Sequence, residues 1–203
     1  MDGLIKILVA LFLSPILGLF FGFLFTKLVF FLARNASMKI NRFFKNAQII
    51  TGVGLALSHG ANDAQKTMGV ISLGLVASGY MQKFEIPFWV ITLCAAAMSM
   101  GTATGGWRLI KTLGGRFYKI RPVHGFCTQV TSAGIILGAA LLGGPVSTTQ
   151  VVSSAIMGVG SAERLNKVRW GVAEQILAAW LLTIPLNMLL AALFCRLLSS
   201  YRP

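Results

Sequence analysis

Residues 4–33 form an apolar run in which only Lys6 and Lys27 carry charge. A helix needs about 20 predominantly apolar residues to cross the hydrocarbon core of a bilayer, and this run is longer. It is also too long for the hydrophobic region of a cleaved signal peptide, and no small-residue cleavage site stands out. We therefore expect it to form a tilted helix that spans a membrane.

The composition agrees with a membrane protein. Apolar residues make up 56% of the 203 and charged residues 11%, whereas soluble domains carry about a quarter charged residues. The formal net charge is +13, but Lys and Arg gather in three short segments between the apolar runs: 34–45, 108–121 and 164–169. Basic loops of this kind follow the positive-inside rule and differ from the extended basic face of a nucleic-acid-binding protein. The pattern predicts contact with lipid and no nucleic-acid partner.

The remaining apolar segments predict an all-α, polytopic protein with a single membrane domain over residues 1–203. Residues 49–81 are too many for one simple helix, so we expect a discontinuous crossing that is broken at 59–63. Further spans are expected at 86–105 and 170–193, which makes four crossings with the first. Between them we expect a basic amphipathic stretch and two polar loops: 38–48, 107–122 and 161–169.

The region at about 123–160 starts and ends beside basic loops, and Gly-Gly-Pro-Val at 143–146 divides it near the middle. Because both ends belong on the same side of the membrane, we expect a re-entrant helical hairpin. Its tip should lie near 144–149.

Two interruptions of the apolar sequence have the same design: a turn with Gly, small polar residues, and then an apolar helix. Gly-Ala-Asn-Asp at 60–63 precedes one such helix, and Gly-Pro-Val-Ser-Thr-Thr at 144–149 precedes the other. Asn, Asp, Ser and Thr favour helix N-termini, where free amides attract anions. Half-helices that end inside the membrane form the substrate sites of many transporters. Three hydroxyl groups, those of Ser147, Thr148 and Thr149, add donors suited to a tetrahedral oxyanion.

Asp63 is one of only five acidic residues, and it lies in apolar sequence. A charge at membrane depth costs several kcal/mol unless it is paired, bound to an ion or hydrated, which makes Asp63 a candidate functional residue. Lys66, three residues later, either supplies a cation to a site or simply neutralises Asp63. His59 and Asp63 have metal-ligand spacing but lack a third ligand nearby, so no metal site is expected. Gln129 either lines a path or bridges two helices.

The sequence His-Gly-Ala-Asn-Asp-Ala-Gln-Lys-Thr-Met-Gly at 59–69 resembles the signature of the inorganic phosphate transporter (Pit) family. Gly-Pro-Val-Ser-Thr-Thr at 144–149, followed by Ala-Ile-Met-Gly-Val-Gly at 155–160, resembles the second motif of that family. The two motifs occur in the family's order, and the resemblance covers nearly the whole chain.

The resemblance implies a secondary transporter of inorganic phosphate in the cytoplasmic (cell inner) membrane, driven by protons or sodium and without another cofactor. It implies that Asn62 and Asp63 lie at the ion and phosphate site, where sodium is one possible occupant. The hydroxyl groups of the hairpin tip would hold phosphate oxygens, either of free phosphate or of a metal–phosphate complex. The full set of site residues implied is Asn62, Asp63, Gln65, Lys66, Thr67, Ser147, Thr148 and Thr149.

Two departures from the family pattern matter. Gln150 stands where the family usually has His, so a histidine-based proton step at that position is excluded. The chain also has one copy of each motif, whereas full-length members have two, and it resembles the carboxyl-terminal half. We therefore expect a half-transporter that needs a partner, either a separate amino-terminal half or a second copy of this chain in a homodimer.

Two alternatives stay open: a non-transporting membrane scaffold or accessory subunit, and an inactive truncated remnant. An enzyme is not expected, because the sequence shows neither a nucleophile with a base nor a cluster of metal ligands.

Overall fold

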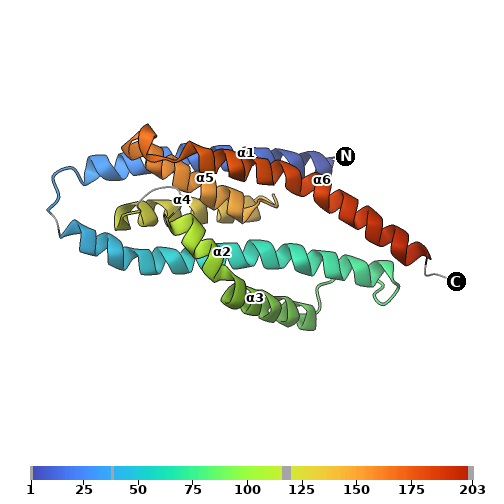
Figure 1. The fold of residues 1–203 in the computed structure, drawn as a ribbon. Helices are drawn as coiled ribbons and strands as arrows, with labels where there is room; N and C mark the ends of the chain where they lie inside the picture. Colours follow the sequence, from blue (N-terminus) through green and yellow to red (C-terminus); the bar gives the residue numbers. More distant parts are fainter. Residues whose placement is uncertain (1, 38, 116–119, 201–203) are drawn as a thin grey trace. The chain divides into compact units, whose positions relative to one another are not determined.

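A computed structural model describes residues 2–37, 39–115 and 120–200. Within these residues the chain is helical and contains no strand (Figure 1). Residues Met1–Val168 form one compact unit, and Arg169–Pro203 form a second one, whose described part is the single long helix Trp170–Ser200. The elements are α1 (Asp2–Leu32), α2 (Ile40–Ala77), α3 (Phe88–Gly115), α4 (Pro122–Leu141), α5 (Thr148–Glu163), the short 3₁₀ helix η1 (Leu165–Lys167) and α6 (Trp170–Ser200).

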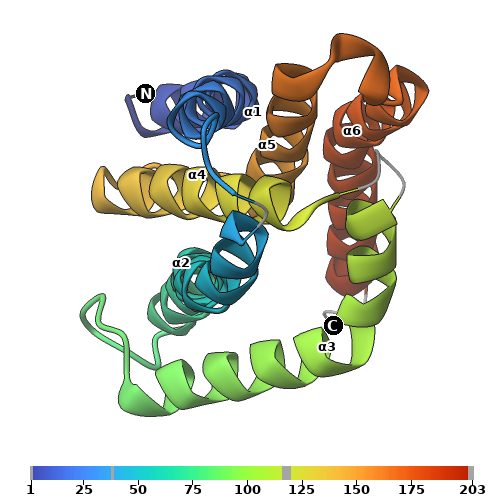
Figure 2. The same cartoon turned by 90° about the vertical axis from the view of Figure 1, so that its left-hand side faces the viewer.

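Helix α4 lies between α1 and α2 and crosses both obliquely, which Figure 2 shows in a view along α1 and α2. Helix α5 packs against α1 and α4, and Ser153–Ala162 are all buried. Helix α3 packs against α2 at the edge of this unit. The centre of the unit is therefore the helical hairpin α4–α5, held between α1 and α2.

Glycines bring α1 and α5 into very close contact. A methyl group added at Gly158 of α5 would lie 2.1 Å from the backbone oxygen of Leu19. One added at Gly22 of α1 would lie 2.8 Å from the backbone oxygen of Ala155. Gly18 and Gly22 form a Gly-x-x-x-Gly pair, the pattern by which membrane helices let their backbones approach. The small residues of these two helices thus fix the position of the hairpin against α1.

The turn of the hairpin is a Schellman motif. Gly143 directly follows Leu142, the C-cap residue of α4, and has a φ of +68°, a conformation that suits glycine. The Gly143 amide bonds to the Ala140 carbonyl at 3.1 Å, and the Gly144 amide bonds to the Ala139 carbonyl at 2.9 Å. These are the two bonds that define the motif. Pro145 follows, so the chain leaves α4 sharply and reaches the start of α5 within a few residues.

The base of the hairpin is closed by an ionic cluster that joins its two helices. Glu163, at the end of α5, lies 2.9 Å from Nη2 of Arg121 and 3.0 Å from Nε2 of the fully buried His124. His124 Nδ1 in turn accepts a hydrogen bond of 3.3 Å from the Arg121 amide at the start of α4. The cluster ties the two ends of the hairpin, while the tip is held by the turn.

Replacing Glu163 with Gln should loosen this base. The variant keeps the size of the side chain but removes the charge that faces both Arg121 and His124, at a cost of roughly 1–3 kcal/mol. Thermal unfolding in detergent measures this as a lower Tm, and Glu85→Gln, in the exposed loop before α3, serves as the control. Equal Tm values for the two variants would show that the cluster adds no stability.

One prediction about α2 is wrong. Residues 59–63 do not interrupt the helix, because α2 runs without a break from Ile40 to Ala77 and contains them, and α2 is not among the described helices that are apolar enough to span a bilayer. It also absorbs most of the predicted amphipathic stretch 38–48. The helix tolerates Gly60 because a single glycine costs only about 1 kcal/mol relative to alanine. The polar side chains at 62 and 63 find partners beside the helix, on the hairpin, so no break is needed to satisfy them.

Other boundaries differ by less. The expected loop 107–122 is helical up to Gly115, and its residues 116–119 lie outside the described part. The hairpin extends from Pro122 to Glu163, slightly beyond the expected limits. The last helix extends to Ser200 and continues through Pro185. Gln129 accepts a hydrogen bond of 2.5 Å from Thr51, so it bridges α4 and α2.

The membrane assignment is supported by the helices themselves. Four of the described helical segments are long and apolar enough to span a bilayer: Ile7–Leu32, Phe88–Trp107, Pro122–Leu141 and Ala173–Leu197. On α1 and α3, Phe12, Ile16 and Phe88 are at least 60% exposed, an arrangement that suits hydrocarbon rather than water. The chain is a polytopic helical membrane protein. The re-entrant path of the hairpin and the single membrane domain stay predictions, and α4 is itself long enough to cross.

Candidate functional site

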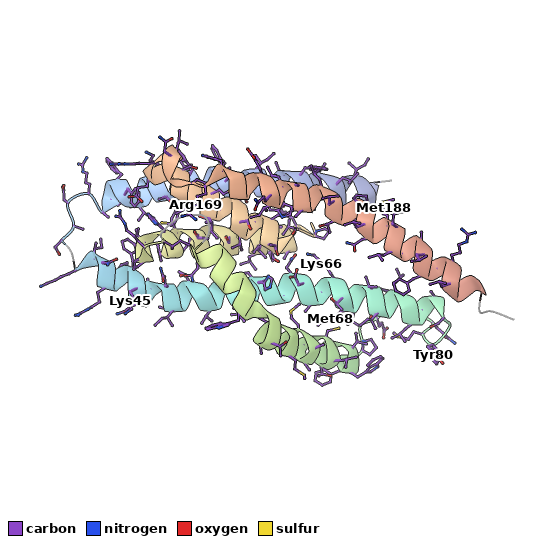
Figure 3. All side chains as sticks on the ribbon, viewed as in Figure 1. Lys45, Lys66, Met68, Tyr80, Arg169 and Met188 are labelled. Atoms are coloured by element: carbon purple, nitrogen blue, oxygen red, sulfur yellow. The ribbon has the colours of Figure 1, made fainter. Side chains whose placement is uncertain are left out.

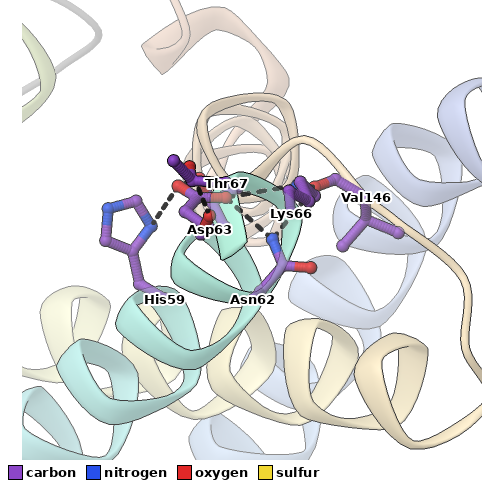
Figure 4. Close-up of polar contacts among 7 residues, drawn as sticks. His59, Asn62, Asp63, Lys66, Thr67 and Val146 are labelled. Carbon is purple, nitrogen blue, oxygen red and sulfur yellow. Dashed lines mark hydrogen bonds and ion pairs between the residues drawn. The ribbon is translucent and has the colours of Figure 1, made fainter. Parts of the chain in front are cut away.

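The middle of α2 meets the tip of the hairpin in a network of polar contacts. Thr148 Oγ1 donates to Asp63 Oδ2 at 3.2 Å, across 85 positions of sequence. Asn62 Nδ2 donates to the backbone oxygen of Val146 at 3.1 Å and to Asp63 Oδ1 at 2.9 Å (Figure 4). The two sequence motifs therefore form one site, although they lie on different helices.

Two basic side chains complete the surroundings of Asp63. The Lys66 ammonium lies 3.2 Å from Asp63 Oδ1 and donates to the Val146 oxygen at 2.5 Å. The His59 ring places Nδ1 3.5 Å from Asp63 Oδ2 (Figure 4). The contact between Lys66 and Asp63 is one of the two alternatives that their spacing left open. The contact of Lys66 with the hairpin was not predicted.

The helical repeat explains why these residues meet. Positions 59, 62, 63 and 66 follow the spacing that places side chains on one face of a helix. That face of α2 is turned to the hairpin tip. Asn62 is only 4% exposed, whereas the side chains of Asp63 and Lys66 are 29% and 38% exposed. The site is therefore closed on the side of Asn62 and open beside the charged groups, as a binding site must be.

The start of α5 adds backbone donors at the same place. Ser147 is the N-cap residue of α5, and its side chain makes no capping hydrogen bond. The Val151 amide bonds to the Ser147 carbonyl at 3.0 Å, so the amides before it have no partner within the helix. Such a helix start carries about half a positive charge and attracts anions. The hydroxyl groups of Ser147 and Thr148 lie at this end.

The structure brings together some of the residues predicted for the site and separates others. Asn62, Asp63, Lys66 and Thr148 form the network, and Ser147 is half-buried beside it. Gln65, Thr67 and Thr149 are exposed, and Thr67 donates to the Asp63 carbonyl of its own helix at 3.2 Å. Their place at a ligand stays a prediction.

Sequence reasoning missed the Val146 carbonyl, which accepts from both Asn62 and Lys66. A backbone oxygen leaves no mark in the residue types. The adjacent Pro145 was the available signal, because it forces the chain out of helical hydrogen bonding at that point. His59 was considered only as a metal ligand. Its neighbourhood contains no group of three acidic, His or Cys side chains, and none exists elsewhere among the described residues.

A helical membrane protein with a carboxylate, an ammonium and an open helix N-terminus converging between its helices has the features of a carrier for a small anion. The model of the phosphate transporter family matches residues 1–191, and the chain belongs to that family. It is 43% identical over 193 residues to a "Probable low-affinity inorganic phosphate transporter" of Bacillus subtilis, covering 94% of this chain and 58% of that protein. A protein of the same description from Rhizobium meliloti is 40% identical over 194 residues, with 95% and 58% covered.

A solved structure of a sodium-dependent phosphate transporter has the same fold. The TM-score is 0.78 at 25% sequence identity, and the match covers 91% of this chain and 64% of that chain. The resemblance to the Pit family and the all-helical fold are thereby confirmed. The relatives are transporters, in agreement with the expectation that the chain is not an enzyme. The chain spans about 58% of the length of these curated relatives.

Proposed function

We propose that this chain forms a substrate-binding part of a secondary transporter that moves inorganic phosphate across the cytoplasmic membrane, coupled to protons or sodium. The observation that carries the proposal is the hydrogen bond between Thr148 and Asp63. It brings a carboxylate on α2 into contact with the start of α5, which attracts anions. Phosphate matches such a site, because its oxygens can accept hydrogen bonds from the start of α5 and its protons can be donated to the carboxylate.

Each part of the site has a role in this proposal. The open amides of α5 and the hydroxyl groups of Ser147, Thr148 and Thr149 donate to phosphate oxygens. Asp63 accepts a hydrogen bond from a protonated phosphate oxygen or, together with Asn62, holds the coupling cation. Lys66 neutralises the charge of Asp63 so that an anion can approach. Gln65 and Thr67, which are exposed beside the network, contact the substrate from the open side.

The rest of the relatives' length supplies the other side of the pocket. We propose an amino-terminal half as this complement, with a homodimer of this chain as the second possibility. Movement of the two parts against each other would expose the site to either side of the membrane in turn. Phosphate travels free or as a metal–phosphate complex. Comparing uptake by cells that produce this chain alone with cells that also produce an amino-terminal half tests the requirement for a partner.

Replacing Thr148 with Val should weaken phosphate binding while the protein stays folded. Val matches the shape of Thr but cannot donate to Asp63 or to a phosphate oxygen. A hydrogen bond to a charged group contributes about 1.5–3 kcal/mol, so phosphate affinity should fall at least about tenfold. Thr148→Ser, which keeps the hydroxyl group, is the matched control and should retain most of the affinity. Equilibrium binding of radiolabelled phosphate to the purified transporter measures both.

The same pair of variants separates a carrier from a scaffold. If Thr148→Val lowered the Tm or prevented assembly while phosphate affinity was unchanged, the hydroxyl group would have a structural role only. A membrane scaffold would then describe the chain better than a carrier.

A further inference from the structure

The Lys66 ammonium contacts two oxygen atoms from different parts of the site. It lies 3.2 Å from Asp63 Oδ1 and 2.5 Å from the Val146 carbonyl oxygen. Thr148 Oγ1 lies against the other oxygen of the same carboxylate, at 3.2 Å. A carboxylate, a backbone carbonyl outside helical hydrogen bonding and a hydroxyl group are the ligand types that hard metal cations prefer. In this chain a covalently attached cation contacts the carboxylate and the carbonyl.

The helical repeat of α2 determines the position of Lys66. Asn62 and Lys66 are four residues apart and therefore lie on one face of α2, and both donate to the same Val146 oxygen. Asn62 is buried and fixes the distance between α2 and the hairpin tip. The ammonium is consequently held at the tip by two contacts, and not by the attraction of Asp63 alone.

A metal cation and this ammonium cannot share the position. Two unit charges about 4 Å apart repel each other by about 4 kcal/mol at the effective dielectric constant of a partly buried site. A cation bound to Asp63 Oδ1 and to the Val146 oxygen would be closer than that to Nζ. The charge of Asp63 is also already balanced by Lys66, so a second cation would gain little.

We propose that Lys66 is a tethered cation that takes the place of a coupling sodium ion beside Asp63, so that ligand binding at this site is independent of sodium. The inference rests on the proposed function, since it concerns the same site, and it selects the proton from the two coupling ions left open above. It sets this chain apart from its sodium-dependent structural neighbour. Removing Lys66 should open the position and create a sodium site.

The test is thermal unfolding of the purified transporter without phosphate, in sodium chloride or in choline chloride of equal ionic strength. The wild type should have the same Tm in both salts. Lys66→Met keeps the approximate length of the side chain without its charge. Its Tm should rise by on the order of 3 °C when the sodium concentration is about ten times the dissociation constant of sodium for this variant. Adding Asp63→Asn to Lys66→Met should abolish the gain, because the carboxylate is then missing.

Lys45→Met is the matched control, because Lys45 is exposed and lies on the same helix, away from the site (Figure 3). It should show no response specific to sodium. A sodium-specific rise in the Tm of the wild type would overturn the proposal, and so would a folded Lys66→Met variant that ignores sodium. If Lys66→Met does not fold, equilibrium binding of radioactive sodium to the wild type decides: saturable binding contradicts the inference, and its absence supports it.

These results are independent of phosphate. Should Lys66→Met gain the sodium response while the wild type fails to bind phosphate, the proposed function would be wrong and the tethered cation would stand. Should phosphate bind to the wild type but require sodium, the proposed function would stand and the tethered cation would be wrong.

Discussion

Asp63→Asn should abolish phosphate uptake while the protein remains in the membrane in normal amount. The substitution keeps the shape of the side chain but removes the charge that Lys66, Thr148 and Asn62 all contact. Lys66 is then left without its counter-charge at a partly buried position, and a protonated phosphate oxygen loses a strong acceptor. Uptake of radiolabelled phosphate by transport-deficient cells that also produce an amino-terminal half measures the loss.

The control for this prediction is Glu85→Gln, which removes an exposed acidic charge from the loop between α2 and α3. Its uptake should equal that of the wild type. Near-normal uptake by Asp63→Asn would remove Asp63 from the transport mechanism, and the proposed site with it.

Gly158→Ala should cause the largest loss of stability. The added methyl group would lie 2.1 Å from the backbone oxygen of Leu19, so α1 and α5 would have to move apart. Overpacking usually costs about 1–3 kcal/mol, and backbone against backbone relaxes less easily than a side chain does. Because whole domains are stable by only about 5–15 kcal/mol, we expect a low yield of folded protein and a clearly reduced Tm.

Gly74→Ala on α2 is the matched control, since nothing lies within 4 Å of the position that its methyl group would take. It should leave the Tm unchanged or raise it slightly, because alanine favours helix more than glycine does. If Gly158→Ala unfolded at the same temperature as Gly74→Ala, the close approach of α1 and α5 would not exist in the protein.

The sequence allowed good predictions where one residue type has one dominant use. Gly-Gly-Pro at the hairpin turn is such a case, because a positive φ followed by proline ends a helix, and Gly143 has that conformation. The apolar runs likewise predicted three of the four described helical segments that are long and apolar enough to span a bilayer; the expected crossing at 49–81 is not among them, and α4 is the fourth. The two motifs were expected to lie together, and Asp63 and Thr148 are in contact, whereas their role at a ligand stays a prediction.

The errors have physical causes. Gly60 with Asn62 and Asp63 suggested a break, but these residues also fit a continuous helix when an adjacent element offers partners. That element was the hairpin, and its contacts depend on residues more than 80 positions away. The burial of α5 was equally hidden, because its Ser, Gly and Ala residues are buried through close backbone packing rather than hydrophobicity. The spacing of Gly18 and Gly22 indicates close helix packing, but the sequence does not show that α5 is the helix that packs there.

The central claim is that phosphate binds between the middle of α2 and the tip of the hairpin, and protection of an introduced cysteine tests it most directly. Cys94 and Cys127 are buried, so Cys195→Ser removes the exposed native thiol, and Thr149→Cys then places a single exposed thiol at the tip. Phosphate, but not chloride, should slow the reaction of this thiol with a maleimide, and Ser78→Cys at the far end of α2 should react at one rate throughout. An equal rate at position 149 with and without saturating phosphate would contradict the account.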